Sequence, residues 1–331
     1  MRRVAVRGGC VGTRGRAARA RCTGRRCSGA QRAACRVGME ACAIAHWFAR
    51  GLARLGHTAR IIAPEFVPPF RLSGKNDAND AAAICAAVRQ PHLCFVAVKS
   101  AQQQAQPVVH RLRQGCQEER TAGLNRLRRL LAEFGRIYPN SAAAILRGAR
   151  AARADETLPV ALRRGFARQL EHLRELDAKL ADCDREIAQQ VHDDTRAQRL
   201  VRLCGVGVLT ASAVAATVTH PQQFRCGRQF AAWIGLTPRQ HSTGGKPRLG
   251  HITRRGDTYL RALLAQKARS ALQAALRIAP PRRTRIAAWI VATYERIGYH
   301  KTPVAIANEH ARLVWVLLTR DEPLHAHVAA S

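Results

Sequence analysis

The segment HSTGGKPRLG, residues 241–250, combines a hydroxyl nucleophile, flexible backbone and positive charge. Ser242 precedes Gly244 and Gly245, and glycine lets the backbone approach a phosphate group closely. Cations that could hold phosphate oxygens follow at Lys246, Arg248, Arg254 and Arg255. A serine placed in this way can attack a phosphodiester and keep the nucleic-acid strand covalently attached, which conserves bond energy for rejoining.

Two other interpretations of this segment stay open. The turn could grip a phosphate while the Ser242 hydroxyl only donates a hydrogen bond. The neighbouring His241 could serve as a general base, but a solvated loop histidine is the more frequent case.

Carboxylates offer a second candidate site. Asp77 and Asp80 are three residues apart at the expected start of a helix, where both could ligate one hard cation. The same spacing is also typical of an N-terminal cap with an acid favoured by the helix dipole. Glu40 follows the apolar run VGM, and an acid at the end of a buried strand needs a metal or another partner. Together the three acids resemble part of a cluster for two divalent ions, although no fourth acid precedes Glu40.

The stretch CGVGVLTASAVAA places Gly205 and Gly207 before a helix of small residues. This pattern resembles a helix-hairpin-helix, whose turn offers backbone N–H groups to nucleic-acid phosphates. Close helix packing through alanine and glycine explains it equally well.

Composition supports a nucleic-acid partner. The chain has 331 residues, 47% of them hydrophobic, and a formal net charge of +33. An excess charge of this size calls for a polyanion. The longest apolar runs are much shorter than the roughly 20 residues that span a bilayer, so we expect no membrane protein. The eleven cysteines include no CxxC pair, which favours reduced thiols in a cytoplasm over zinc or disulfides.

The chain divides into segments of different character. Residues 1–36 contain eleven arginines and six glycines, and we expect them to be disordered or poorly formed. Residues 37–105 show a strand, helix, strand pattern that predicts an α/β sheet, and they include a further short apolar run, LCFVAVKS, at residues 93–100. Residues 106–200, 201–285 and 286–331 are predicted to be mainly helical.

Apolar residues recur at helical spacing between residues 162 and 191. The set is Phe166, Leu170, Leu173, Leu176, Leu180, Cys183, Ile187 and Val191. Steps of three and four indicate a long antiparallel helical pair or coiled coil, and an ordinary amphipathic helix packed in its own domain is an equal alternative. Three tryptophans, Trp47, Trp233 and Trp289, fall on apolar helical faces, so we expect them to pack in cores and not to stack on bases.

Four separated segments carry a family resemblance. They are VGMEACAIAHWFARGLARLGH, KNDANDAAAICAAV, FAAWIGLTPRQHSTGGKPRLGHITRRGDTYLRALL and KTPVAIANEHARLVWVLL. Together they resemble the insertion-sequence transposases of the one-ten family, eleven-eleven subgroup, over about residues 37 to 325.

The resemblance implies a fold and a set of roles. Residues 37–105 would be an incomplete RuvC-like domain of the RNase H fold with a D-E-D-D carboxylate set, residues 106–200 a coiled coil, and residues 201–285 a serine transposase domain. Glu40 would be the E, Asp77 and Asp80 the last two D's, and Ser242 the nucleophile that forms a phosphoserine link to DNA. Mg²⁺ would be the metal.

The resemblance makes the partners and the location more specific. DNA and a bridge RNA encoded by the element would be the nucleic-acid partners. Dimers that pair into tetramers would join the RuvC-like domain of one protomer to the serine of another. The implied location is the bacterial cytoplasm, in association with the nucleoid.

The chain departs from the family pattern at its start. Family members open with an apolar strand that carries the first Asp. Here MRRVAV is followed by a segment rich in Gly, Arg and Cys. A frameshift or a misassigned start would explain this, and the hypothesis fails if neither other reading frame encodes an apolar strand with an Asp. Three functions follow as alternatives: a strand-transferring transposase, a non-catalytic DNA- and RNA-binding remnant, and a RuvC-type junction nuclease that does not use the serine.

Overall fold

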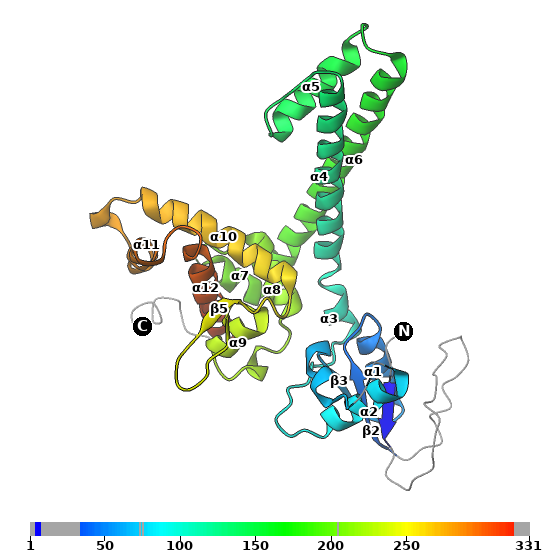
Figure 1. Ribbon diagram of the computed structural model, residues 1–331, viewed down its shortest axis with the longest axis vertical. Coiled ribbons are helices and arrows are strands. Elements are labelled where there is room, and N and C mark those ends of the chain that lie inside the picture. The colour runs from blue at the N-terminus through cyan, green and yellow to red at the C-terminus, as the bar shows by residue number, and fades with distance from the viewer. Residues whose placement is uncertain (1–3, 8–33, 73, 75, 204, 321–331) are drawn as a thin grey trace. The chain divides into compact units, whose positions relative to one another are not determined.

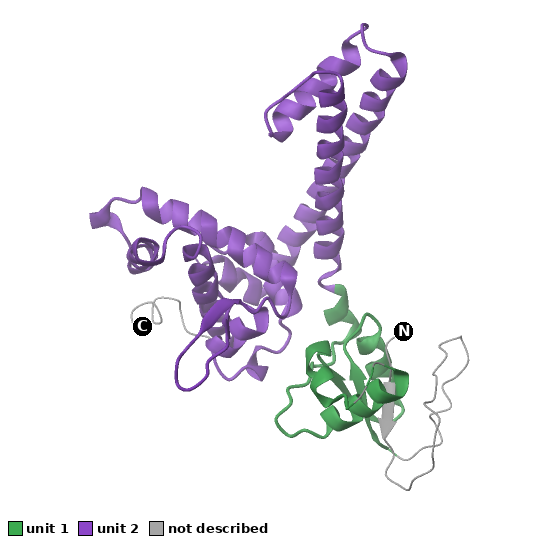
Figure 2. Cartoon of the chain, in the orientation of Figure 1, with its two compact units in different colours: residues 1–105 green, residues 106–331 purple. Residues whose placement is uncertain are grey.

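The computed structural model shows a mostly helical chain that divides into two compact units. Unit 1 comprises residues 1–105 and unit 2 comprises residues 106–331 (Figure 2). The structure describes residues 4–7, 34–72, 74, 76–203 and 205–320.

Unit 1 contains a three-stranded sheet in the order β1-β2-β3 (Figure 1). Strand β2 (Arg36–Glu40) pairs in parallel with β3 (Thr58–Ile62), and helix α1 (Ala45–Arg54) connects them. Parallel neighbours need such a crossover connection, because a tight turn can join only antiparallel strands. The predicted strand, helix, strand pattern is thus confirmed. The RNase H-like topology stays a prediction.

The two faces of β2 are covered by different helices. Val37 and Met39 pack in one cluster with the α1 residues Ala45 and Ala49. On the other face, a Cβ atom on Gly38 would lie 2.2 Å from Val88 of helix α2 (Asp77–Val88). Because side chains alternate along a strand, Glu40 projects to the same side as Gly38, toward α2.

The rest of unit 1 is irregular. Two short 3-10 turns, η2 (Pro64–Phe66) and η3 (Pro68–Phe70), follow β3. The apolar run LCFVAVKS forms only an isolated bridge between Val96 and Ile61. Helix α3 (Ala101–Ala105) closes the unit, and Arg50 of α1 ties it down with hydrogen bonds to Lys99 O and Gln104 Oε1.

The structure corrects one expectation for residues 1–36. Val4–Arg7 form strand β1, which pairs antiparallel with β2 from Val4 opposite Met39 to Arg7 opposite Arg36. The backbone hydrogen-bond ladder along β2 accounts for the pairing. Residues 8–33, for which disorder was also expected, lie outside the described part of the chain.

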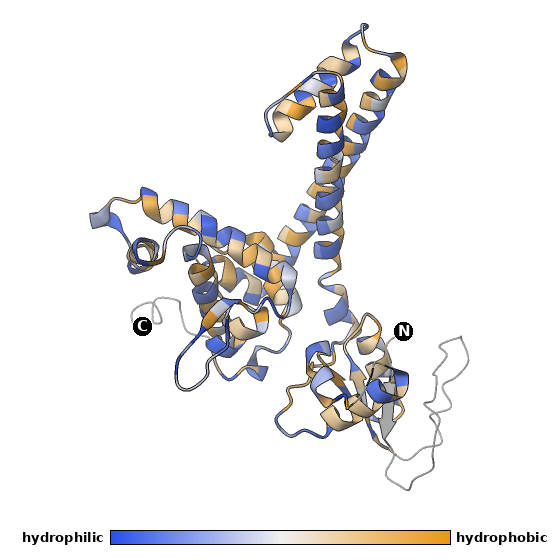
Figure 3. Cartoon of the chain, in the orientation of Figure 1, coloured by the Kyte–Doolittle hydropathy of each residue, from blue (hydrophilic) through white to orange (hydrophobic). Residues whose placement is uncertain are grey.

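Unit 2 begins with a helical arm made of α4 (Val108–Glu133), α5 (Ala142–Ala154) and α6 (Val160–Asp193). Helices α4 and α6 are antiparallel, since Arg113 pairs with Asp184 and Arg120 pairs with Asp177. All members of the predicted apolar set are buried along α6 except Cys183, which is half-buried. Figure 3 shows apolar and polar residues alternating along these helices. The long antiparallel helical pair is confirmed, and a coiled coil in the strict sense stays a prediction.

The remaining helices of unit 2 share one hydrophobic core, which extends from Leu200 to Leu318. Residues 201–285 and 286–331 were predicted as two separate segments, but they pack together around this core. The elements in chain order are α7 (Thr195–Val201), α8 (Val208–Thr217), η4 (Pro221–Gln223), α9 (Gly227–Ile234), β4 (Pro238–Gln240), β5 (Leu249–Ile252), α10 (Thr258–Arg277), η5 (Pro280–Arg282), α11 (Arg285–Ile297) and α12 (Thr302–Thr319).

Two of the three tryptophan predictions are wrong. Trp233 packs against the core of unit 2, as expected. Trp47 on α1 and Trp289 on α11 are 57% and 39% exposed. Helix α1 buries its small alanines and α11 buries Ala287, Ile290 and Val291, so each indole is left on the opposite face.

Among the described residues, no helix combines the length and the apolar character needed to cross a membrane.

Candidate functional site: an exposed basic hairpin that carries Ser242

Ser242 lies in the hairpin formed by β4 and β5, which projects from the helices of unit 2 (Figure 1). Gly244 and Gly245 form its tip with φ angles of +56° and +74°, and Lys246 N donates to Thr243 O over 3.1 Å. Two consecutive left-handed residues are the signature of a type I′ turn, which glycine adopts without strain. A Cβ on either glycine would meet no atom within 4 Å, so the backbone here is open to a ligand.

The Ser242 hydroxyl oxygen accepts two hydrogen bonds within the hairpin. Arg248 N donates to it over 3.1 Å and Gln240 Nε2 over 2.9 Å. Both bonds use the oxygen as an acceptor, so the hydroxyl proton can be directed outward. Residues 238–251 are all exposed, His241 among them, as the solvated-loop interpretation expects.

The base of the hairpin is held by close backbone packing. A Cβ on Gly235 would lie 2.2 Å from Arg255 O, and one on Gly256 would lie 1.9 Å from Trp233 O. Both glycines have positive φ, +82° and +72°. The two ends of the hairpin can therefore meet only where neither residue has a side chain.

Arg261 on α10 braces the same base, and no sequence pattern had pointed to this residue. Its Nη1 donates to Ile234 O over 2.9 Å and to Arg255 O over 2.8 Å. These carbonyls belong to the chain entering and leaving the hairpin. One guanidinium thus fixes both ends to the first turn of α10.

Positive charge dominates the hairpin. Residues 238–256 contain Arg239, Lys246, Arg248, Arg254 and Arg255 and no Asp or Glu. Arg239, Lys246, Arg248, Arg254 and Arg255 are all exposed. The surface around Ser242 is therefore suited to a polyanion.

Arg254 combines this charge with backbone strain, since its φ of +56° is the only positive value for a non-glycine residue in the described ranges. We expect Arg254→Gly to change the free energy of unfolding by less than about 1 kcal/mol, because relief of left-handed strain offsets the added freedom of the unfolded chain. DNA affinity should nevertheless fall severalfold, with a shallower salt dependence, because one exposed cation suited to a phosphate is lost. Arg254→Ala keeps the strain and loses the charge, so it should show the same affinity loss. DNA titrations at several salt concentrations measure this, and unchanged affinity in both variants contradicts it.

The predicted metal-binding acids lie in unit 1. Asn76 caps α2 by accepting a hydrogen bond from Asn79 N, and Asp77 and Asp80 lie in the first turn behind it. Asp80 is one turn before Ile84, on the helix face that packs toward Gly38. Glu40 and Asp80 therefore belong to facing surfaces of β2 and α2.

These acids do not form a metal site as they are arranged. Arg71 Nε is 2.9 Å from Asp80 Oδ1, so a guanidinium balances this carboxylate. Within the described ranges, no three His, Cys, Asp or Glu side chains lie close enough together to hold a metal ion. Glu40, Asp77 and Asp80 thus do not fit a shared metal site in this arrangement.

Gly205 and Gly207 lie between α7 and α8. Gly205 has a φ of +83°, and a Cβ there would lie 2.8 Å from His310 Cε1. Gly207 caps α8, and the Lys267 ammonium lies 3.5 Å from the position of its missing Cβ. Thr210 to Ala216 are buried, which accords with close helix packing, while the lysine beside the helix start accords with a phosphate contact. Both interpretations stay open.

Comparison with known proteins identifies the family. The model of the Transposase IS116/IS110/IS902 family matches residues 197–282, which include the whole hairpin and Ser242. A "probable family 20 transposase" of Pseudomonas aeruginosa is 45% identical over 290 residues, 87% of this chain and 85% of that protein.

Two further relatives carry the names of insertion sequences. The transposase for insertion sequence element IS1328 of Yersinia enterocolitica is 38% identical over 86% of this chain and 84% of its own length. The transposase for insertion sequence element IS1111A of Coxiella burnetii is 35% identical over 86% of this chain and 78% of its own length. The chain therefore belongs to the IS116/IS110/IS902 family of insertion-sequence transposases.

Proposed function

We propose that this transposase cuts and rejoins DNA strands with Ser242 as the nucleophile. The observation that carries the proposal is the exposed, wholly basic hairpin, in which the Ser242 oxygen is oriented by two donors. A nucleophile on an exposed ribbon can reach a phosphate within a duplex, where a buried serine could not.

The reaction is an exchange of esters. Ser242 Oγ attacks the phosphorus and releases its proton, while the bond from phosphorus to one deoxyribose oxygen breaks and that oxygen takes up a proton. The resulting phosphoserine diester conserves the energy of the broken bond, so a deoxyribose hydroxyl of another strand can reverse the step and join the strands. Lys246, Arg248 and Arg254 would balance the phosphate charge.

The metal requirement is a separate part of the proposal. Mg²⁺ would bind at Glu40, Asp77 and Asp80 only after the ion pair between Arg71 and Asp80 breaks. No step of the ester exchange described above depends on Mg²⁺. Thermal unfolding of the full chain with and without Mg²⁺ tests this. We expect stabilisation that Asp80→Asn removes, and equal Mg²⁺ responses of the two proteins would contradict the site.

An RNA guide and assembly into dimers or tetramers complete the proposal. They are drawn from the family resemblance, and the +33 net charge supports a large polyanionic partner. Light scattering of the chain alone and with the RNA transcribed from its element tests both, with a complex of two or four chains as the expected result.

The decisive experiment is to trap the covalent intermediate. The full chain is incubated with RNA, Mg²⁺ and donor plus target DNA, and adducts that survive denaturation are digested and mapped by mass spectrometry. We expect a nucleotide on Ser242 and complete loss of the adduct in Ser242→Ala. Thr243→Ala, one residue away in the same hairpin, is the matched control and should keep the adduct.

The same experiment separates the alternatives. DNA binding without any adduct supports a non-catalytic remnant, which the Arg71–Asp80 pair favours. Cleavage that Ser242→Ala leaves intact supports a RuvC-type nuclease. Either result overturns the serine mechanism.

A further inference from the structure

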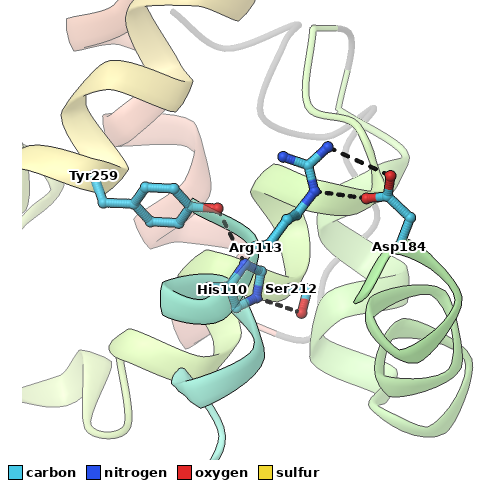
Figure 4. Close-up of polar contacts among 5 residues, drawn as sticks. All are labelled: His110, Arg113, Asp184, Ser212 and Tyr259. Atoms are coloured by element: carbon cyan, nitrogen blue, oxygen red, sulfur yellow. Dashed lines mark hydrogen bonds and ion pairs between the residues drawn. The ribbon is translucent and has the colours of Figure 1, made fainter. Parts of the chain in front are cut away.

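A chain of hydrogen bonds, centred on the buried His110 and Ser212, joins four helices of unit 2 at the root of the helical arm. Figure 4 shows His110 between Ser212 and Tyr259. His110 lies in the first turn of α4 and is 2% exposed. Its Nε2 is 2.9 Å from Ser212 Oγ on α8, and its Nδ1 is 3.3 Å from the Tyr259 hydroxyl on α10. Ser212 Oγ in turn donates to Gln190 Oε1 on α6 over 3.2 Å.

The partners fix the direction of every bond in this chain. The Ser212 hydroxyl donates its only proton to Gln190 Oε1. The Ser212 oxygen must therefore accept the hydrogen bond from His110 Nε2–H. His110 Nδ1 is then the unprotonated nitrogen and accepts the proton of Tyr259. The order of donation is Tyr259 to His110 to Ser212 to Gln190, with a neutral imidazole in the middle.

The surroundings keep these groups in that state. Burial, together with the positive charge of Arg113, lowers the pKa of His110 to about 4. Burial also raises the pKa of Tyr259, so its hydroxyl stays a donor. Arg113, one turn along α4, bonds both oxygens of Asp184 on α6 over 2.7 and 3.4 Å, which secures the same end of the arm.

Tyr259 stands next to the base of the Ser242 hairpin. It is the second residue of α10, three residues after Gly256. Arg261 in the same helical turn holds the carbonyls of Ile234 and Arg255 at the two ends of the hairpin. The first turn of α10 is therefore bonded to the arm through Tyr259 and to the hairpin through Arg261.

We propose that His110 and Tyr259 are positioning residues, which couple the helical arm to the hairpin so that Ser242 is held in place for attack on DNA. This role rests on the function proposed above for Ser242. Neither residue touches the reacting atoms. Their effect is exerted on the rigidity and placement of the hairpin base.

The test uses Tyr259→Phe in the full chain, because this change removes one hydroxyl and keeps the ring in the core. We expect backbone amides of residues 249–258 to exchange with solvent about tenfold faster, and the Ser242–DNA adduct to form about tenfold more slowly, as for the loss of one hydrogen bond. DNA affinity should stay unchanged, because no group on the hairpin surface is altered.

Controls separate positioning from a general loss of stability. Tyr294→Phe removes a tyrosine hydroxyl from the surface of the same core and should alter neither readout. His110→Gln retains a donor and an acceptor on one amide and should restore both readouts relative to His110→Ala. If Tyr259→Phe leaves exchange at residues 249–258 unchanged, the proposal is wrong. Hydrogen exchange can be measured in a protein without catalytic activity. The test of the coupling therefore remains valid even if no adduct with Ser242 forms in the parent protein.

Discussion

Replacing Gly256 with alanine should lower the free energy of unfolding of unit 2 by more than about 3 kcal/mol and abolish formation of the Ser242 adduct. The new Cβ would lie 1.9 Å from Trp233 O, and a backbone atom of a packed helix cannot yield cheaply. The residue would also keep a φ of +72°, which costs an L-residue roughly 1–2 kcal/mol. The two ends of the hairpin must then separate, and Ser242 moves with them. Hydrogen exchange in α8 and α10 measures the stability of this core.

Gly245→Ala is the matched control for this change. Its φ of +74° is nearly the same, but a Cβ there meets nothing within 4 Å. We expect only the backbone strain, about 1 kcal/mol and confined to the hairpin tip. Equal losses in the two variants would show that the close approach to Trp233 O is unimportant.

Acid should destabilise unit 2 before its carboxylates titrate. Burial lowers the pKa of His310 to about 4, and burial with Arg113 does the same for His110. In the unfolded chain both imidazoles are protonated below their ordinary pKa of 6.5, while in the folded protein they resist protonation until about pH 4. Stability is therefore complete above pH 6.5 and falls as the pH drops toward 4. The loss is about 2 kcal/mol per histidine at pH 5 and about 3 kcal/mol at pH 4.

Unfolding free energies measured between pH 7 and pH 5 check this. His310→Leu removes one of the two groups, so we expect about half the pH dependence and a gain in stability at pH 5. His300→Gln alters an exposed histidine of the same unit and should leave the dependence unchanged. A flat profile for the parent protein would contradict the burial argument.

Local sequence signals predicted the elements well where one period or one turn dominates. Apolar steps of three and four placed Phe166 to Val191 on the buried face of α6. The Gly244–Gly245 pair sits at a hairpin tip, where two positive φ angles are needed. The same reasoning gave the β2–α1–β3 crossover. In each case a pattern within a few neighbouring residues was enough to predict the element, because local backbone geometry decides whether a helix, strand or turn forms.

Predictions about which side chains meet were less successful. Trp47 and Trp289 are exposed although both helices are amphipathic, because alanines and smaller aliphatic residues form the buried faces. Asp80 pairs with Arg71, which lies in an irregular segment with no periodic signal, and metal binding by Asp80 stays a prediction.

The sequence by itself thus determined the helices, the basic turn around Ser242 and, through four separated segments, the family, whereas the strands β4 and β5 beside that turn were not predicted. Only the tertiary structure decided that His110 meets Ser212 and Tyr259, which are 102 and 149 residues away along the chain, and that Arg261 joins the two ends of the hairpin. The physical reason is the range of the interactions. Backbone preferences act between near neighbours, whereas a side chain's partners depend on which helix faces pack together, and that is set by the whole core.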